Sequence, residues 1–328
     1  MPNDGKLGEF ELIDRFFAGA PSPTPRPDVL LGIGDDAALL RLPPGTDLVA
    51  AVDTLVAGRH FPAGSDARSI GHRALAVNLS DLAAMGATPA WATLALTLPS
   101  AERAWLERFS AGLHALASEY GVALVGGDTT AGPLTISVQI LGYIAAGAGL
   151  RRSGAQPGDL LVVTGTLGDA GAGLALLQGR VSAAERAVAD ALVQRFEYPT
   201  PRVHFGSLAR DIASAAMDLS DGLVGDLPKL ATASAVAAHV EVARLPLSAP
   251  LTALVSLDRA REWALSAGDD YELLLTVKPQ RLGELMAAAS RLNLTLTVIG
   301  DLRRGTGVTW TLDGAEFQAP THGYDHFR

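Results

Sequence analysis

Apolar residues along the first half of the chain follow two spacings in turn, which predicts strands interleaved with helices. From residue 66 to residue 85 they recur at helical spacing. A second helix is predicted over residues 101–120, with Ser100 as its N-cap. Short runs rich in apolar and β-branched residues predict strands at 48–52, 91–98, 122–125 and 135–144.

Glycine and proline between residues 147 and 159 interrupt the pattern and indicate a connection between domains. We expect the boundary near Leu150, giving domains 1–149 and 150–328, in keeping with about 150 residues per domain. The second half predicts strands at 160–164, 239–242, 273–277 and 294–299, and helices at 170–178, 183–195, 205–212, 223–235 and 279–292. Both halves are therefore expected to be α+β.

Composition narrows the class of protein. Hydrophobic residues make up 48% of the 328 residues, which excludes disorder, and the net charge of −9 opposes nonspecific binding to nucleic acid or to an anionic membrane. The absence of cysteine excludes disulfides, thiolate nucleophiles and Cys-ligated metals, and suits a reducing compartment. No apolar leader or run of about 18 apolar residues is present, so we expect a cytoplasmic protein without a membrane partner.

Several well-known catalytic motifs are missing from the sequence. Lysine occurs only at Lys6, Lys229 and Lys278, none of them in a GxxxxGK[ST] loop, which excludes a P-loop nucleotide site. The sequence also lacks an HRD/DFG pair, an HExxH motif and a GxSxG elbow. If the protein handles phosphate, something other than lysine must offset the negative charge.

Aspartate is the residue type that stands out. Singly, an Asp beside glycine or after a strand is ordinary turn or cap chemistry. Asp81 is different, because it lies inside an apolar helical pattern and must face solvent, pair with a cation or bind a metal. Hard divalent cations prefer such oxygen ligands, and magnesium usually takes one or two carboxylates with substrate phosphates, so a set of aspartates suggests several ions. Structural calcium is the alternative, although no DxDxDG-type loop is present.

Two further segments allow more than one interpretation. The glycine-rich run 165–173 follows a predicted strand and opens a predicted helix; it fits either a phosphate cradle or close packing of helix on strand. Adjacent Asp269 and Asp270 precede a predicted strand, and repulsion between the two carboxylates favours exposure of both.

The motifs, taken in order, resemble one family, the thiamine-monophosphate kinases of the aminoimidazole ribonucleotide synthetase-like superfamily. The matching segments run from residue 8 to residue 327, essentially the whole chain: GEF with LI (8–13), GIGDDAA (32–38), VDTLV with HF (52–61), AVNLSDLAAMGA (76–87), GGDTT (126–130), RSGAQPGD (152–159), MDLSDGL (217–223), GDDYEL (268–273) and GYDHF (323–327). Each motif alone is weak, but the ordered set is specific.

The resemblance implies transfer of the ATP γ-phosphoryl group to thiamine monophosphate, with several Mg²⁺ ions as cofactors. It also implies a homodimer whose N-terminal mixed α/β domains form a β-barrel-like core, and a C-terminal α+β sandwich domain. The acceptor phosphate is already anionic, so no residue is expected to act as a general base. Because two polyanions must meet, metal ions held by carboxylates would offset their repulsion.

Site residues follow from the resemblance, position by position. Metal ligands would be Asp36, Asp53, Asp81, Asp128, Asp218 and Asp221; ATP contacts would be Gly127, Asp128, Arg152 and Ser220; substrate contacts would be His60, Asp269 and Tyr324. Two positions depart from the family pattern. Ala51 and Val52 stand where hydroxyl residues are common, and Asp269 stands where Glu is commoner.

Two alternatives remain open from the sequence. The chain could be another ATP-dependent synthetase of the same superfamily, or a sensor that binds nucleotide or metal without turnover. The lack of cysteine argues against selenophosphate synthetases and the hydrogenase-maturation relative, which use a reactive Cys or selenocysteine.

Overall fold

The computed structural model describes residues 8–18, 26–324 and 326, and the chain divides into two compact units. The first unit runs to Leu82 and continues from Thr88 to Gly147, and the second comprises Ala83–Ala87 and everything from Ala148 onward. The main change of unit thus lies two residues before the boundary predicted near Leu150. No helix in the described ranges is long and apolar enough to cross a membrane.

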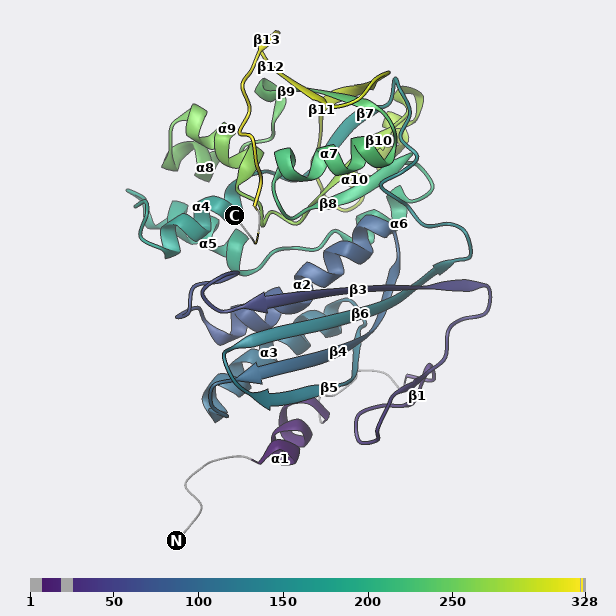
Figure 1. Cartoon of the computed structure of the whole chain (residues 1–328), viewed down its shortest axis with the longest axis vertical. Helices are drawn as coiled ribbons and strands as arrows, with labels where there is room; N and C mark the ends of the chain where they lie inside the picture. Colours follow the sequence, from purple (N-terminus) through teal and green to yellow (C-terminus); the bar gives the residue numbers. More distant parts are fainter. Residues whose placement is uncertain (1–7, 19–25, 325, 327–328) are drawn as a thin grey trace. The chain divides into compact units, whose positions relative to one another are not determined.

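A four-stranded sheet forms the centre of the first unit, in the order β3-β6-β4-β5 (Figure 1). The strands are β3 (Thr46–Val56), β6 (Thr135–Ala145), β4 (Thr88–Leu98) and β5 (Ala123–Ala131). β6 pairs antiparallel with both neighbours, whereas β4 and β5 are parallel. A parallel pair needs a crossover connection, and α3 (Arg103–Glu119) provides it.

Two helices, α2 (Ala67–Met85) and α3, cover one face of this sheet. Alternate residues of β6, including Ile136, Val138 and Ile140, are buried beneath them. The helices approach unusually closely: a Cβ at Gly71 would lie 2.0 Å from the carbonyl oxygen of Phe109, and one at Gly112 would lie 2.0 Å from that of Arg68. Glycine at both positions is what allows the two backbones to touch.

The opposite face of the sheet is only partly covered within this unit. A small pair of strands, β1 (Val29–Leu31) and β2 (Leu39–Leu40), packs near Trp91 at one end. Elsewhere β3 exposes apolar side chains, with Leu48 53% and Val52 63% exposed. The described strands of this unit do not close, so one chain by itself does not form the expected barrel-like core. Near the start of the chain, α1 (Glu9–Ile13) continues into a π-helix, η1 (Asp14–Ala18).

The second unit contains a seven-stranded sheet in the order β13-β12-β9-β11-β7-β10-β8. All neighbours are antiparallel except β12 and β9. The strands are β7 (Leu160–Thr164), β8 (Ala215–Leu219), β9 (Ala237–Glu241), β10 (Glu272–Val277), β11 (Leu296–Arg303), β12 (Val308–Leu312) and β13 (Ala315–Glu316). The described helices are α4 (Asp169–Leu177), α5 (Arg186–Glu197), α6 (Val203–Ala209), α7 (Leu223–Ala233), α8 (Ala249–Leu254), α9 (Leu257–Ser266) and α10 (Leu282–Ser290), with 3₁₀ turns η2 (Val242–Arg244) and η3 (Pro279–Arg281).

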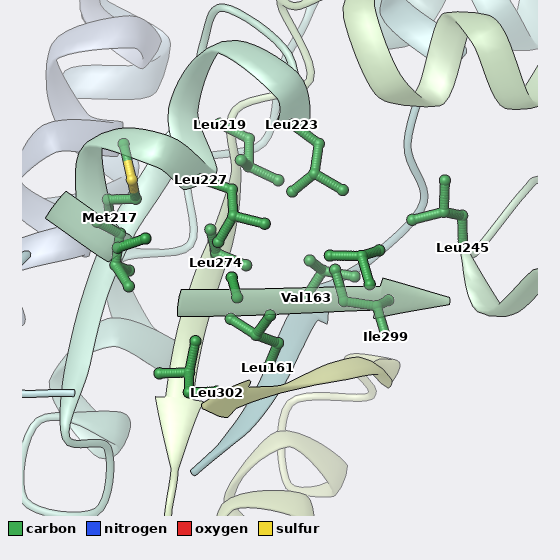
Figure 2. Close-up of a cluster of buried hydrophobic side chains, with 14 of the residues drawn as sticks. Leu161, Val163, Met217, Leu219, Leu223, Leu227, Leu245, Leu274, Ile299 and Leu302 are labelled. Carbon is green, nitrogen blue, oxygen red and sulfur yellow. The ribbon is translucent and has the colours of Figure 1, made fainter. Parts of the chain in front are cut away.

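One face of this sheet packs against α7 to form the main core of the unit. Figure 2 shows leucine, valine and isoleucine side chains of the sheet meeting Leu223 and Leu227 of α7. Met217 and Leu219 of β8 belong to this core, so the intervening Asp218 lies on the opposite face of the strand. The core therefore fixes the direction in which Asp218 points.

Most sequence-predicted elements are present, which supports the α+β class, but the structure differs in several places, and β1, β2, α8, α9, β12 and β13 were not predicted. α3 begins at Arg103 after Glu102, and Ser100 Oγ donates to Glu102 Oε1 at 3.2 Å, so the prediction of Ser100 as N-cap was wrong. Strand β8 was not predicted, because its sequence AAMDL has no β-branched residue.

The α2–α3 contact predicts that alanine is destabilising at Gly71 but not at Gly283, a glycine of α10 outside this contact. Gly71→Ala should lower the free energy of unfolding by about 1–3 kcal/mol, because the added methyl group meets backbone that cannot move aside. Gly283→Ala in α10 should be neutral or stabilising by up to about 1 kcal/mol, because nothing lies within 4 Å of the new methyl group. Chemical denaturation followed by circular dichroism measures both. Equal effects of the two substitutions would contradict the proposed backbone contact.

Candidate active site

A cavity of about 670 Å³ in the first unit brings together three of the predicted site residues. Asp36 lines it from the loop before β2, and Gly127 and Asp128 line it from β5. Ile13 and Phe17 of the N-terminal helical segment contribute apolar wall. Both carboxylates are exposed. The cavity is therefore large enough for a nucleotide-sized molecule and, with Asp35, has three acidic groups in its wall.

Gly127 is required by its surroundings. A Cβ at this position would lie 1.9 Å from the carbonyl oxygen of Leu94 on the neighbouring strand. Its φ of +152° is also one that residues with a side chain rarely adopt. Asp128 lies opposite the small Ala95 on β4. Backbone and carboxylate are thus both accessible from the cavity.

Asn78 of α2 holds the backbone at Asp53. The backbone N–H of Asp53 on β3 donates to Asn78 Oδ1 at 3.0 Å, and the amide group of Asn78 in turn donates to the carbonyl oxygen of Ala74. Asp81 follows Asn78 by three residues and so lies on the same face of α2. The structure brings Asp53 towards the face of α2 that carries Asp81. Neither neighbour at positions 51 and 52 offers a side-chain oxygen.

His60 is held by the end of β3. Its ring Nδ1 accepts a hydrogen bond from the backbone N–H of Val56 at 3.0 Å. The backbone N–H of His60 donates to the carbonyl oxygen of Val56, also at 3.0 Å. With Nδ1 as acceptor, the neutral ring carries its proton on Nε2. The side chain is partly exposed and therefore presents a donor rather than an acceptor.

In the second unit, three segments distant in sequence meet at the end of β8. The N–H of Asp269 donates to the carbonyl oxygen of Ser220 at 2.8 Å, and the N–H of Tyr324 donates to that of Asp221 at 3.0 Å. A Cβ at Gly323 would lie 2.2 Å from Asp221 O, so only glycine allows this approach. Four predicted residues, Ser220, Asp221, Asp269 and Tyr324, therefore converge in one place.

Asp226 and Lys229 complete this loop. Asp226 is buried, and its Oδ2 accepts the backbone N–H groups of Ser220 at 3.0 Å and Asp221 at 2.9 Å. Lys229 donates to Asp226 Oδ1 at 2.9 Å and to Asp221 Oδ2 at 2.6 Å. Neither residue was predicted as part of the site. The rarity of lysine in the sequence was the available signal for Lys229.

The expectation that Asp269 and Asp270 are both exposed was wrong for Asp270. Its side chain is buried, with Oδ2 accepting the N–H of Gly168 at 2.7 Å and Oδ1 that of Ala170 at 3.3 Å. Asp270 therefore occupies the amides at the start of α4, a helix in which Gly173 packs against the Leu192 backbone. For the glycine-rich run these contacts favour close packing over a phosphate cradle.

Glu272 is fully buried two residues later. It accepts hydrogen bonds from Thr164 Oγ1 at 2.6 Å, Arg195 at 2.8 Å and Arg202 Nε at 2.7 Å. Burial alone would raise the pKa of Glu272, but the two guanidinium groups, Arg202 foremost, hold it below its ordinary value. Glu272 therefore remains charged and ties β10 to β7 and to the α5–α6 segment.

Arg152 lies apart from the Ser220 loop. The carbonyl oxygen of neighbouring Arg151 accepts the N–H of Ala216 at 3.0 Å, near the first residue of β8, whereas Ser220 follows its last residue. The Arg152 side chain is exposed. Within the second unit, the structure does not bring Arg152 and Ser220 together.

The donor set suits magnesium better than an all-protein cage. Among the described residues, no three His, Asp or Glu side chains lie close enough together to enclose a metal ion. Carboxylates beside an open cavity, such as Asp36 and Asp128, fit an ion that takes one or two protein oxygens and fills its remaining positions with water and phosphate oxygens. A calcium site built wholly from protein is not supported by these residues.

Comparison with known families defines the class of protein. The N-terminal domain of AIR synthase related proteins matches residues 34–144, and the C-terminal domain of the same proteins matches residues 156–313. This places the chain among two-domain AIR synthase related proteins. The hydrogenase maturation protein HypE of Escherichia coli, at 23% identity and a TM-score of 0.77, shares the fold.

Individual relatives narrow the class. Thiamine-monophosphate kinases of Salmonella typhimurium and Escherichia coli K12 are 50% and 48% identical, each over 98% of both chains. The crystal structure of thiamine-monophosphate kinase from Stenotrophomonas maltophilia K279a has a TM-score of 0.86 at 48% identity, covering 95% of this chain and 98% of that one. AaThiL complexed with AMPPCP and TMP has a TM-score of 0.77 at 34% identity, with 88% and 89% covered. The chain belongs to the thiamine-monophosphate kinase family.

Asp270 predicts a pH dependence of stability. Burial raises its pKa from 3.8 to about 8, although the Gly168 amide and Arg195 oppose the shift. The folded state therefore binds this proton more tightly than the unfolded state, so the stabilisation is complete below about pH 4 and is lost as pH rises through about 8. We expect the free energy of unfolding to fall across this range.

Asp270→Asn provides the control, because the amide keeps a hydrogen-bond acceptor but does not titrate. Urea unfolding at several pH values should show a shallower decline for this variant than for the wild type. The same decline in both proteins would show that other groups cause it.

Proposed function

We propose that this protein transfers the γ-phosphoryl group of ATP to thiamine monophosphate, giving thiamine diphosphate and ADP. The main support is that residues from the ordered motifs lie together in two places. Asp36, Gly127 and Asp128 line one cavity, and Ser220, Asp221, Asp269 and Tyr324 meet at the end of β8. The 50% identical relative bears the name thiamine-monophosphate kinase, and AaThiL binds AMPPCP and TMP.

The proposed roles follow from the chemistry of each group. Gly127 lets the backbone approach a nucleotide in the cavity, and Ser220 and Arg152 donate to phosphate oxygens. His60 donates from Nε2 to the substrate phosphate, while Asp269 and Tyr324 bind the thiamine part. No side chain removes a proton, because the attacking phosphate oxygen is already anionic. The protein positions both reactants and offsets their charge.

The carboxylates are proposed to hold Mg²⁺, namely Asp36, Asp53, Asp81, Asp128, Asp218 and Asp221. When bound, Mg²⁺ reduces the repulsion between the two phosphate groups and stabilises the charge of the transferred group. Ala51 and Val52 can contribute only backbone oxygens or bound water here. The number of protein ligands per ion is therefore smaller than it would be with hydroxyl side chains at those positions.

Turnover tests the function directly. Purified protein with ATP, Mg²⁺ and thiamine monophosphate should form thiamine diphosphate, detectable by chromatography, and chelation of the metal should stop the reaction. ATP consumption only with an aminoimidazole-pathway amide would select a related synthetase instead. ATP binding without any turnover would indicate a sensor.

Carboxylate substitutions separate catalysis from folding. Asp128→Asn and Asp218→Asn should each reduce kcat/KM at least about 100-fold, equivalent to about 2.7 kcal/mol, because each removes a metal ligand. Their melting temperatures should stay within a few degrees of the wild type. Asp47→Asn, which changes an exposed carboxylate of β3 that accepts the Gly147 N–H, is the control and should keep full activity. Loss of melting temperature in step with activity would point to a structural role.

We also propose a homodimer formed through the open face of the four-stranded sheet. Exposed Leu48 and Val52 lie on this face, and Leu30 and Leu39 of the adjoining β1–β2 pair are 51% and 57% exposed. Clustered apolar side chains of this kind are typical of an interface. A second copy of the sheet would cover them and give the barrel-like core that one chain lacks.

Leu48→Asp should convert the dimer to monomer, because it would place a charge in the apolar interface. Light scattering coupled to size-exclusion chromatography measures the mass directly. Leu257→Asp, at an exposed leucine of α9 in the second unit, should leave the dimer intact. A wild-type protein that is monomeric at micromolar concentration would refute the interface.

A further inference from the structure

Lys229 contacts two carboxylates of different character. Its Nζ lies 2.6 Å from Asp221 Oδ2 and 2.9 Å from Asp226 Oδ1. The Asp226 side chain is 2% exposed, whereas the side chains of Asp221 and Lys229 are 31% and 44% exposed. One ammonium group thus bridges a buried anion and a partly exposed one.

The contact with Asp226 has a clear structural reason. A buried carboxylate requires compensation, and Asp226 receives it from two backbone N–H groups at Oδ2 and from Lys229 at Oδ1. The two residues are three positions apart on α7, so their side chains lie on the same helix face. The ion pair with Asp226 therefore holds Lys229 in place whether or not Lys229 also contacts Asp221.

The contact with Asp221 has no such reason. Asp221 is partly accessible to water, and an exposed ion pair of this kind contributes little to stability. Its carboxylate is, however, one of the groups proposed to bind Mg²⁺. Lys229 places its positive charge at Oδ2 of this carboxylate.

We propose that Lys229 is a positioning residue that acts as a replaceable counter-ion of Asp221. The ammonium group holds the Asp221 carboxylate in place before a divalent cation binds, and the arriving cation displaces it from Oδ2. Asp226 keeps the lysine on the loop after the exchange. This inference rests on the proposed function, since it takes Asp221 as a metal ligand.

The arrangement has a measurable consequence for metal affinity. A cation that binds Asp221 must compete with Lys229 and is repelled by its charge, so the lysine weakens binding at this carboxylate. Removing the ammonium group should therefore tighten divalent-cation binding, although it removes a stabilising ion pair. A lysine with a purely structural role would change stability without changing affinity.

Titration of the purified full chain with Mn²⁺ alone, followed by electron paramagnetic resonance of the free ion, tests this. Lys229→Met should bind Mn²⁺ about tenfold more tightly at one site, equivalent to about 1.4 kcal/mol. Lys229→Arg keeps the charge and should stay near the wild type. Lys278→Met removes the same charge at the start of η3 and should change nothing.

Two double variants keep the test independent of folding. Asp226→Asn with Lys229→Met removes the buried anion together with its partner, so it should fold and still show the tighter site. Asp221→Asn with Lys229→Met should lose the gain. The proposal is overturned if Lys229→Met binds Mn²⁺ no more tightly than Lys278→Met, or if the gain survives Asp221→Asn. Wild-type turnover of thiamine monophosphate is measured on the same preparation, so failure of the proposed function is recognised separately.

Discussion

Burial of two carboxylates in the segment leading into β10 is the constraint on which the second unit depends. Glu272 and Asp270 are both almost inaccessible to water, and an uncompensated charge at either position would be strongly destabilising. Arg195 and Arg202 compensate Glu272, and the first amides of α4 bind Asp270. The strand and two helical segments are therefore held together by the charge of Glu272, and the start of α4 by hydrogen bonds to Asp270.

The backbone around these buried groups is itself constrained by hydrogen bonds to the end of β8. The residues that precede Asp270 and Glu272 both have left-handed backbone: φ is 64° at Asp269 and 49° at Tyr271. Each such residue costs on the order of 1 kcal/mol, so the surroundings must impose the conformation. The hydrogen bonds from Asp269 N to Ser220 O and from Tyr271 N to Leu219 O do so. The Asp269 side chain, proposed to bind the substrate, is thus positioned by the pairing of its loop with the end of β8.

The fold was largely predictable from the sequence because its helices and central strands are locally encoded. Helix α2 has apolar residues at helical spacing along its 19 residues, and β7 is a continuous apolar run, so each is recognisable from its own residues. The strand β8 was not, since AAMDL becomes a strand only by pairing with β10 more than 50 residues later. The barrel-like core expected for a dimer cannot be judged from one chain, because closure needs strands that the first unit does not contain.

The candidate site was predictable as a list of residues but not as a geometry. Motifs identified Asp128, Ser220, Asp221, Asp269 and Tyr324, because their residue types and order are those of the family. The supporting groups escaped notice, since Asp226, Lys229 and Asn78 act through contacts that only the folded chain creates. Asp270 was misjudged because repulsion from Asp269 was considered without the helix amides that oppose it. Arg152 remains a family-based prediction that the second unit alone does not support.

Reciprocal glycines where α2 crosses α3 have a mechanical consequence. Where side chains separate two packed helices, the helices can shift relative to each other through small rotamer changes. At Gly71 and Gly112 no side chain separates the helices, and the two backbones are in direct contact. Helix α2, which carries Asn78 and Asp81, therefore cannot slide along α3. The two helices should move together as one rigid unit. Any adjustment that accompanies ligand capture in the first unit is then left to its loops, such as the one that carries Asp36.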